Sequence, residues 1–134
     1  RDSAIHSIIN SLRDENLEDC FEYIREIFRG IDYDLQISQE KYYQTVFYLI
    51  FSLIGMKIKT EVKTNIGRID AVIDDNHTYI FEFKLNGTKA QALQQIKDRK
   101  YHEKYTNKGK SIYLIGVEFQ NRNIGEYVYE IIPR

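Results

Sequence analysis

The 134-residue sequence has few of the residues that cross-link or interrupt a fold. It contains one cysteine, one proline and no tryptophan, so an internal disulfide is excluded and a reducing compartment fits best. Its longest apolar run, residues 46–54, is far shorter than the roughly 20 residues that a membrane span needs. No charged-then-apolar signal segment opens the chain. We therefore expect a soluble cytoplasmic protein that makes no membrane contact.

The sequence also lacks an excess of charge of one sign. Its 19 basic and 20 acidic residues give a formal net charge of −1, so any contact with nucleic acid requires a local basic patch. Residues 1–40 hold four basic and ten acidic residues, whereas residues 84–110 hold eight basic and two acidic ones. The start at Arg1 and the acidic opening predict the C-terminal part of a longer protein.

Apolar spacing predicts three helices before residue 56. Two amphipathic helices fall within residues 5–12 and 17–28, and Asn16 supplies a start signal for the second. A third helix, residues 38–55, is so apolar that most of its circumference is expected to be buried. Ser38 is its candidate cap.

The apolar pattern then changes to a period of two, which is typical of strands. Antiparallel strands are predicted around residues 57–62, 68–73 and 80–85. A helix over residues 88–105, a strand over residues 111–118 and a weaker edge strand over residues 127–132 follow. This order predicts an α/β fold in which helices pack on a central mixed sheet. We expect an acidic helical segment, residues 1–34, that packs on or links to a core domain, residues 35–134.

A charged pair inside the third predicted strand suggests a site. Glu82 and Lys84 share one face of that strand, and the phenylalanines on either side of Glu82 share the other. A three-residue loop at residues 75–77 would place Asp70 opposite Glu82. Two carboxylates suit Mg²⁺ or Mn²⁺. A salt bridge on a solvated sheet face explains the same residues, and both interpretations stay open.

These residues resemble the motif of the PD-(D/E)XK nuclease superfamily. The matching positions are Glu40 on the apolar helix, Asp70, then after eleven residues Glu82-Phe83-Lys84, and Gln95 on the following helix. The chain is similar in particular to the branch of bacterial proteins in which this module follows an AAA-ATPase-like domain. The likeness runs from about residue 32 to residue 126, and Ile69 stands where the motif has proline.

The resemblance implies the three-layer restriction-endonuclease-like fold, with an αβββαβ core, and metal-dependent cleavage of DNA or RNA. Asp70 and Glu82 would bind Mg²⁺ or Mn²⁺, with Glu40 and the Phe83 carbonyl as further ligands. Lys84 would orient the attacking water or stabilise the developing charge. Gln95 would complete the catalytic set. A catalytically inactive module of the same fold, which binds nucleic acid or protein beside an upstream ATPase domain, is the alternative.

Four basic residues are candidates for phosphate contacts. Lys89, Lys97 and Lys100 fall on one stripe of the helix predicted after the third strand, and Arg68 has the same strand parity as Asp70. Such residues track a nucleic-acid backbone. A solvated helix face explains the three lysines as well, and pairing with an acidic neighbour explains Arg68.

Overall fold

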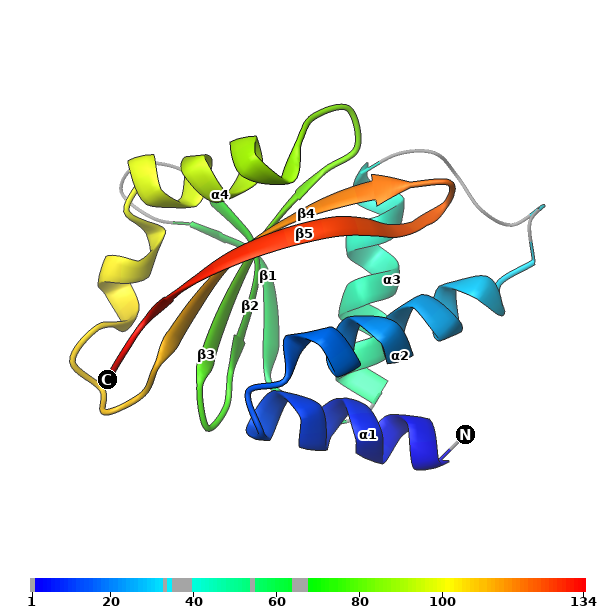
Figure 1. The fold of residues 1–134 in the computed structure, drawn as a ribbon, viewed down its shortest axis with the longest axis horizontal. Coiled ribbons are helices and arrows are strands. Elements are labelled where there is room, and N and C mark those ends of the chain that lie inside the picture. Colours follow the sequence, from blue (N-terminus) through cyan, green and yellow to red (C-terminus); the bar gives the residue numbers. More distant parts are fainter. Residues whose placement is uncertain (1, 33, 35–39, 54, 64–67) are drawn as a thin grey trace.

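The computed structural model describes residues 2–32, 34, 40–53, 55–63 and 68–134. The elements in chain order (Figure 1) are α1 (Asp2–Arg13), α2 (Leu17–Arg29), α3 (Glu40–Leu53), β1 (Ile58–Lys63), β2 (Arg68–Asp74), β3 (Thr78–Lys84), α4 (Lys89–Asp98), the 3-10 helix η2 (Tyr101–Tyr105), β4 (Ile112–Gln120) and β5 (Asn123–Ile132). The predicted αβββαβ order is present from α3 to β4. None of the described helices has the length and apolar character to span a bilayer.

The five strands form one mixed sheet whose spatial order, β1-β2-β3-β4-β5, follows the chain. The first three strands pair antiparallel, β4 runs parallel to β3, and β5 returns antiparallel. A parallel pair needs a long crossover connection, and α4 with η2 supplies it. β3 is therefore the central strand, and all of its residues except the last are buried.

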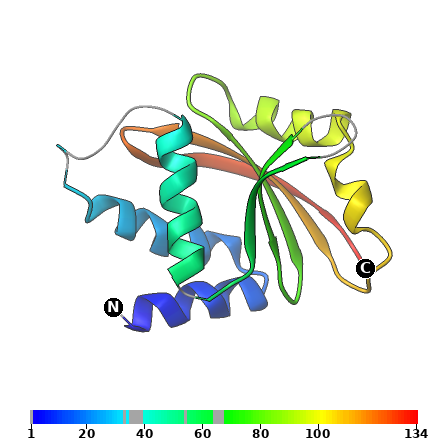
Figure 2. The same ribbon diagram turned by 180° about the vertical axis from the view of Figure 1, so that it is seen from behind.

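Helices cover both faces of the sheet. On one face, here called the α1–α3 face, the rings of Phe47 in α3 and Phe81 in β3 pack at a centroid distance of 4.9 Å. On the other, here called the α4 face, Ile96 of α4 packs on Ile80 of β3. Figures 1 and 2 show α4 and the α1–α2 pair on different sides of the strands. The predicted three-layer α/β architecture is confirmed.

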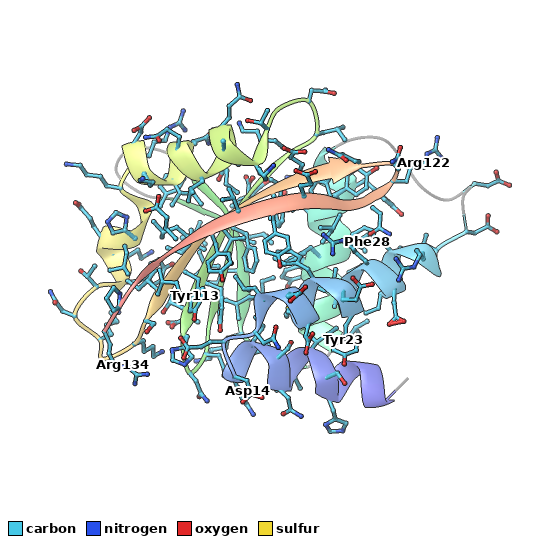
Figure 3. All side chains as sticks on the ribbon, in the orientation of Figure 1. Asp14, Tyr23, Phe28, Tyr113, Arg122 and Arg134 are labelled. Atoms are coloured by element: carbon cyan, nitrogen blue, oxygen red, sulfur yellow. The ribbon has the colours of Figure 1, made fainter. Side chains whose placement is uncertain are left out.

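Aromatic packing fixes α3 against the sheet. Tyr43 of α3 stacks on Phe119 of β4 at a centroid distance of 4.3 Å, and Phe28 of α2 (Figure 3) packs against both rings at 6.0 and 6.5 Å. Phe83 of β3 lies 5.1 Å from Phe47 of α3. These contacts hold the first half of α3 beside the carboxyl end of β3, where the predicted site residues lie.

The helix predicted over residues 88–105 is shorter than expected. α4 ends at Asp98, because Lys100 adopts a left-handed conformation (φ 53°) and the chain continues as η2. The turn buries Tyr101 and Tyr105 on the α4 face, where they are 1% and 7% exposed. The free energy gained by removing two aromatic rings from water offsets the free energy lost with the helical hydrogen bonds.

α3 is less buried than its composition predicts. Tyr48, Leu49 and Leu53 are 39%, 49% and 81% exposed, because α3 contacts the sheet with one side and leaves the other to solvent. The predicted cap Ser38 lies outside the described residues. The edge strand β5 is longer than predicted and begins at Asn123, since it pairs with β4 almost throughout.

Candidate active site

The β2–β3 hairpin brings two carboxylates to the α4 face. Residues 75–77 form the three-residue loop, and the register pairs Ala71 with Phe81. One step further along this ladder, Asp70 lies opposite Glu82. The expectation that an odd loop aligns these two residues is confirmed.

Asp70 is held from two elements where the β2–β3 ladder ends. Its Oδ2 accepts a hydrogen bond of 2.9 Å from the backbone N–H of Phe83. The carboxylate therefore accepts the hydrogen bond that a backbone carbonyl of the neighbouring strand would otherwise accept from this N–H group. Its own carbonyl accepts a 2.7 Å hydrogen bond from Nε2 of Gln44 in α3. Both the backbone and the side chain of Asp70 are thus fixed.

Glu82 is buried, with 4% of its surface exposed. Its Oε2 accepts a 2.6 Å hydrogen bond from Gln95, while its buried Oε1 has no hydrogen-bond partner within the described part of the chain. Burial, and then the neighbouring Asp70 charge, raise the pKa of Glu82 to about 8, against an opposing effect of Lys84. A buried oxygen without a partner is costly, so a proton or a cation at this position would stabilise the site.

Gln95 connects Glu82 with Lys84. Its Nε2 donates to Glu82, and its Oε1 accepts a 2.9 Å hydrogen bond from the Lys84 ammonium. One amide thus sets the spacing of the acid and the amine, because the oxygen and nitrogen of a side-chain amide have a fixed separation. The structure brings together four predicted catalytic residues: Asp70, Glu82, Lys84 and Gln95.

A close approach between α4 and β4 positions Gln95. Gly116 of β4 pairs with Glu82 of β3. A Cβ atom on this glycine would lie 2.2 Å from the carbonyl oxygen of Lys89 and 2.6 Å from the nitrogen of Leu93. The absence of a side chain therefore lets the backbone of α4 lie directly on the sheet beside Glu82.

A cavity of about 310 Å³ opens beside Asp70. Its lining consists of Lys41, Gln44, Glu61, Asp70 and Phe83. Lys41 at the start of α3 forms an ion pair with Glu61 of β1. Asp70 therefore borders a space that solvent or a ligand can enter, whereas Glu82 is buried and does not belong to the described lining.

The sequence analysis missed Lys41, Gln44 and Glu61, although two signals were available. Gln44 follows Glu40 by four residues, and positions i and i+4 share a helix face. A four-residue turn at residues 64–67 would set the β1–β2 register that aligns Glu61 with Asp70. The structure has this register, since the pairs on either side of that position are Thr60 with Ala71 and Val62 with Ile69.

The donor set fits a divalent cation. Among the described residues, no three or more histidine, cysteine or acidic side chains are grouped so as to hold a metal. Asp70 and Glu82 supply two carboxylates, and the buried Glu82 Oε1 is an acceptor without a hydrogen-bond partner among the residues that the structure describes. Mg²⁺ is commonly held by one or two carboxylates and keeps several waters. The side chain of Glu40 lies outside the described residues, and Phe83 borders the cavity; their ligand roles stay predictions.

The predicted lysine stripe of α4 does not extend to Lys100. Lys89 and Lys97 form ion pairs with the β5 residues Glu126 and Glu130, whereas Lys100 lies beyond the end of α4 and is exposed. Lys89 and Lys97 therefore share one environment and Lys100 has another, and the contact of all three with nucleic acid stays a prediction. The same holds for Arg68, whose side chain lies outside the described residues.

Comparison with known proteins decides the family. The model of the PD-(D/E)XK nuclease superfamily matches residues 38–126, which include both carboxylates, the lysine and the glutamine described above. The chain belongs to the PD-(D/E)XK nuclease superfamily. Its αβββαβ core and mixed sheet are consistent with the restriction-endonuclease-like fold of this superfamily, whose members generally use divalent metals.

A curated relative extends well beyond this superfamily module. It is the "Uncharacterized protein in vnfD 5'region" of Azotobacter chroococcum mcd 1, which is 45% identical over 96 residues, or 68% of this chain and 19% of the relative. The match thus spans about a fifth of the relative's length. No solved structure matches the chain significantly.

Proposed function

We propose that this protein hydrolyses phosphodiester bonds in DNA or RNA with Mg²⁺ or Mn²⁺ bound at Asp70 and Glu82. The observation that carries the proposal is the convergence of these two carboxylates on adjacent strands, with the buried Oε1 of Glu82 lacking a hydrogen-bond partner in the described part of the chain. Lys84 lies within the same hydrogen-bonded group, through Gln95. Membership of a nuclease superfamily supports this chemistry.

Each residue has a defined part in this proposal. A divalent cation, when bound, makes a coordinated water more acidic and offsets negative charge on the phosphate. Asp70 and Glu82 hold the cation, and the Phe83 N–H keeps the Asp70 carboxylate oriented. Lys84 orients the attacking water or stabilises the charge that develops on the phosphate. Gln95 is a positioning residue, since it contacts Glu82 and Lys84.

A cleavage assay with matched variants tests the proposal. Labelled single-stranded, double-stranded and branched oligonucleotides are incubated with the purified protein and Mg²⁺ or Mn²⁺. Asp70→Asn, Glu82→Gln and Lys84→Ala should each abolish cleavage. Asp74→Asn is the control, because Asp74 lies four residues along the same strand and pairs with Lys110 at 2.8 Å. Cleavage that survives the first two changes would refute the assignment.

A binding module without catalysis is the second candidate. The near-zero net charge favours it, because proteins that grip nucleic acid usually carry more positive surface. Oligonucleotide binding without cleavage, together with no Mn²⁺ site by calorimetric titration, would support it. We also propose that the module acts beside an upstream ATPase-like domain in the cytoplasm. The far greater length of the relative is compatible with such a partner domain.

A further inference from the structure

A groove leads away from Asp70 between α3 and β1. The cavity beside Asp70 shares Lys41, Gln44 and Glu61 with a second hollow of about 130 Å³. The lining of this second hollow adds Thr45, Tyr48 and Thr60. Tyr48 is 39% exposed and lies seven residues after Lys41, about 10 Å along the helix axis. The groove thus presents a carboxylate, a cation and an aromatic ring in succession.

The backbone of β1 is unusual where it borders this groove. Glu61 has φ 51°, a left-handed backbone conformation that residues other than glycine rarely adopt inside a strand. Strand alternation would group Glu61 with Lys59, whose partner Val72 faces α4. Glu61 instead pairs with Lys41 of α3. The residue with the left-handed backbone, Glu61, is therefore also the one that forms the ion pair across the groove.

We propose that this groove binds a single-stranded segment of the nucleic-acid substrate. Lys41 binds a phosphate of that segment, which displaces Glu61, and Tyr48 stacks on a base. The inference rests on the proposed function, because a strand in the groove leads to Asp70. Lys41 is 67% exposed and Glu61 38% at their side chains. Exposed ion pairs contribute little free energy, so a phosphate can replace the carboxylate at small cost.

The roles of the two groove features predict effects of opposite sign. Removing Lys41 removes a phosphate contact, whereas neutralising Glu61 removes the anion that competes with the substrate for Lys41. Bases stack on aromatic side chains largely without regard to sequence. Tyr48 should therefore contribute to the binding of single strands of any sequence, and little to duplexes, whose bases are already stacked.

Fluorescence anisotropy with labelled oligonucleotides in metal-free buffer tests the groove without cleavage. Lys41→Ala should weaken single-strand binding and reduce the salt slope by about 1. Tyr48→Ala should weaken it by about 5-fold or more. Glu61→Gln should tighten it several-fold, roughly what one exposed ion pair allows. The Glu61→Gln effect should vanish in the Lys41→Ala background. Circular dichroism verifies that each variant is folded.

Arg29→Ala and Glu22→Gln are the matched controls, since they break an exposed ion pair of 3.7 Å on α2. Both should leave single-strand binding unchanged. Equal affinities for the wild type and Lys41→Ala would overturn the groove but leave the nuclease proposal standing. Weakening by Arg29→Ala alone would do the same and favour a path over α2. A wild type that binds no oligonucleotide would refute both.

Discussion

Glu82 links the stability of the fold to pH, because its buried carboxyl group has a pKa of about 8 rather than the ordinary 4.5. Between these values the folded protein retains a proton that the unfolded chain releases. The contribution of Glu82 to stability is therefore fully present below the ordinary pKa and is lost as pH rises through this window. The full effect is on the order of 5 kcal/mol. We expect the free energy of unfolding of the wild type, measured by urea denaturation, to decrease accordingly.

The Glu82→Gln variant isolates this contribution from other titrating groups. Glutamine keeps the shape and cannot ionise, so its stability relative to the wild type should increase from pH 4.5 to pH 8. Asp74 and Asp75 have pKa values below the ordinary range, and their effects fall at lower pH in both proteins. Parallel stability curves for the variant and the wild type would show that Glu82 is not the group responsible.

Gln95 should control the affinity of the site for metal. Gln95→Ala removes the donor to Glu82 Oε2 and the acceptor for Lys84. Removing a residue that orients a metal ligand typically lowers affinity by about 10- to 100-fold. Calorimetric titration with Mn²⁺ measures this loss. Gln94→Ala is the control, because Gln94 is exposed and bonds Asp98 at 2.7 Å. Equal Mn²⁺ affinities in both variants would contradict the positioning role.

At the scale of elements, the contact between α4 and β4 requires a residue without a side chain at Gly116. Gly116→Ala would place a methyl group within 2.6 Å of two backbone atoms of α4, so the helix must move away from the sheet. Overpacking of this kind costs about 1–3 kcal/mol. We expect a lower midpoint of urea denaturation and weaker Mn²⁺ binding, since Gln95 moves with α4.

Gly125→Ala is the matched control in β5. Its new Cβ would meet only the side chain of Gln120, at 2.9 Å, and that flexible chain can move aside. Stability and Mn²⁺ binding should then stay close to the wild type. Should Gly116→Ala bind Mn²⁺ as tightly as Gly125→Ala, the close seating of α4 would not be what positions the site.

The central elements were predictable because their patterns are local. Alternation fixed the faces of β2 and β3, and a short loop fixed their register, so the neighbouring positions of Asp70 and Glu82 followed from the sequence. The end of α4 could not be predicted in this way, because the helical spacing of the sequence continues to Tyr105. The chain leaves the helix earlier because Tyr101 is buried against the sheet, which is a tertiary contact. The orientation of Glu61 was also hidden, since its left-handed backbone depends on tertiary contacts.

At the scale of the whole molecule, the acidic N-terminal helices are part of the folded core. Five residues of α2 are buried: Leu17, Cys20, Phe21, Ile24 and Phe28. Arg25 donates to the carbonyl oxygens of Ile124 and Gly125 in β5. The Tyr113 hydroxyl donates to Glu15 in the α1–α2 turn at 2.5 Å, and Arg13 pairs with Asp75 at 3.0 Å. The buried residues of α1 and α2 therefore belong to the same hydrophobic cluster as those of α3 and the sheet.

Deleting residues 1–34 should unfold the remaining chain. The five buried residues of α2 contribute roughly 2 kcal/mol each, or about 10 kcal/mol together, which approaches the entire stability of a typical domain. Near-UV circular dichroism and thermal melting of residues 35–134 measure the outcome. Tyr113→Phe gives a graded test in the full chain and should cost about 1 kcal/mol. Native spectra and an unchanged melting temperature for the shortened chain would show instead that residues 35–134 fold alone.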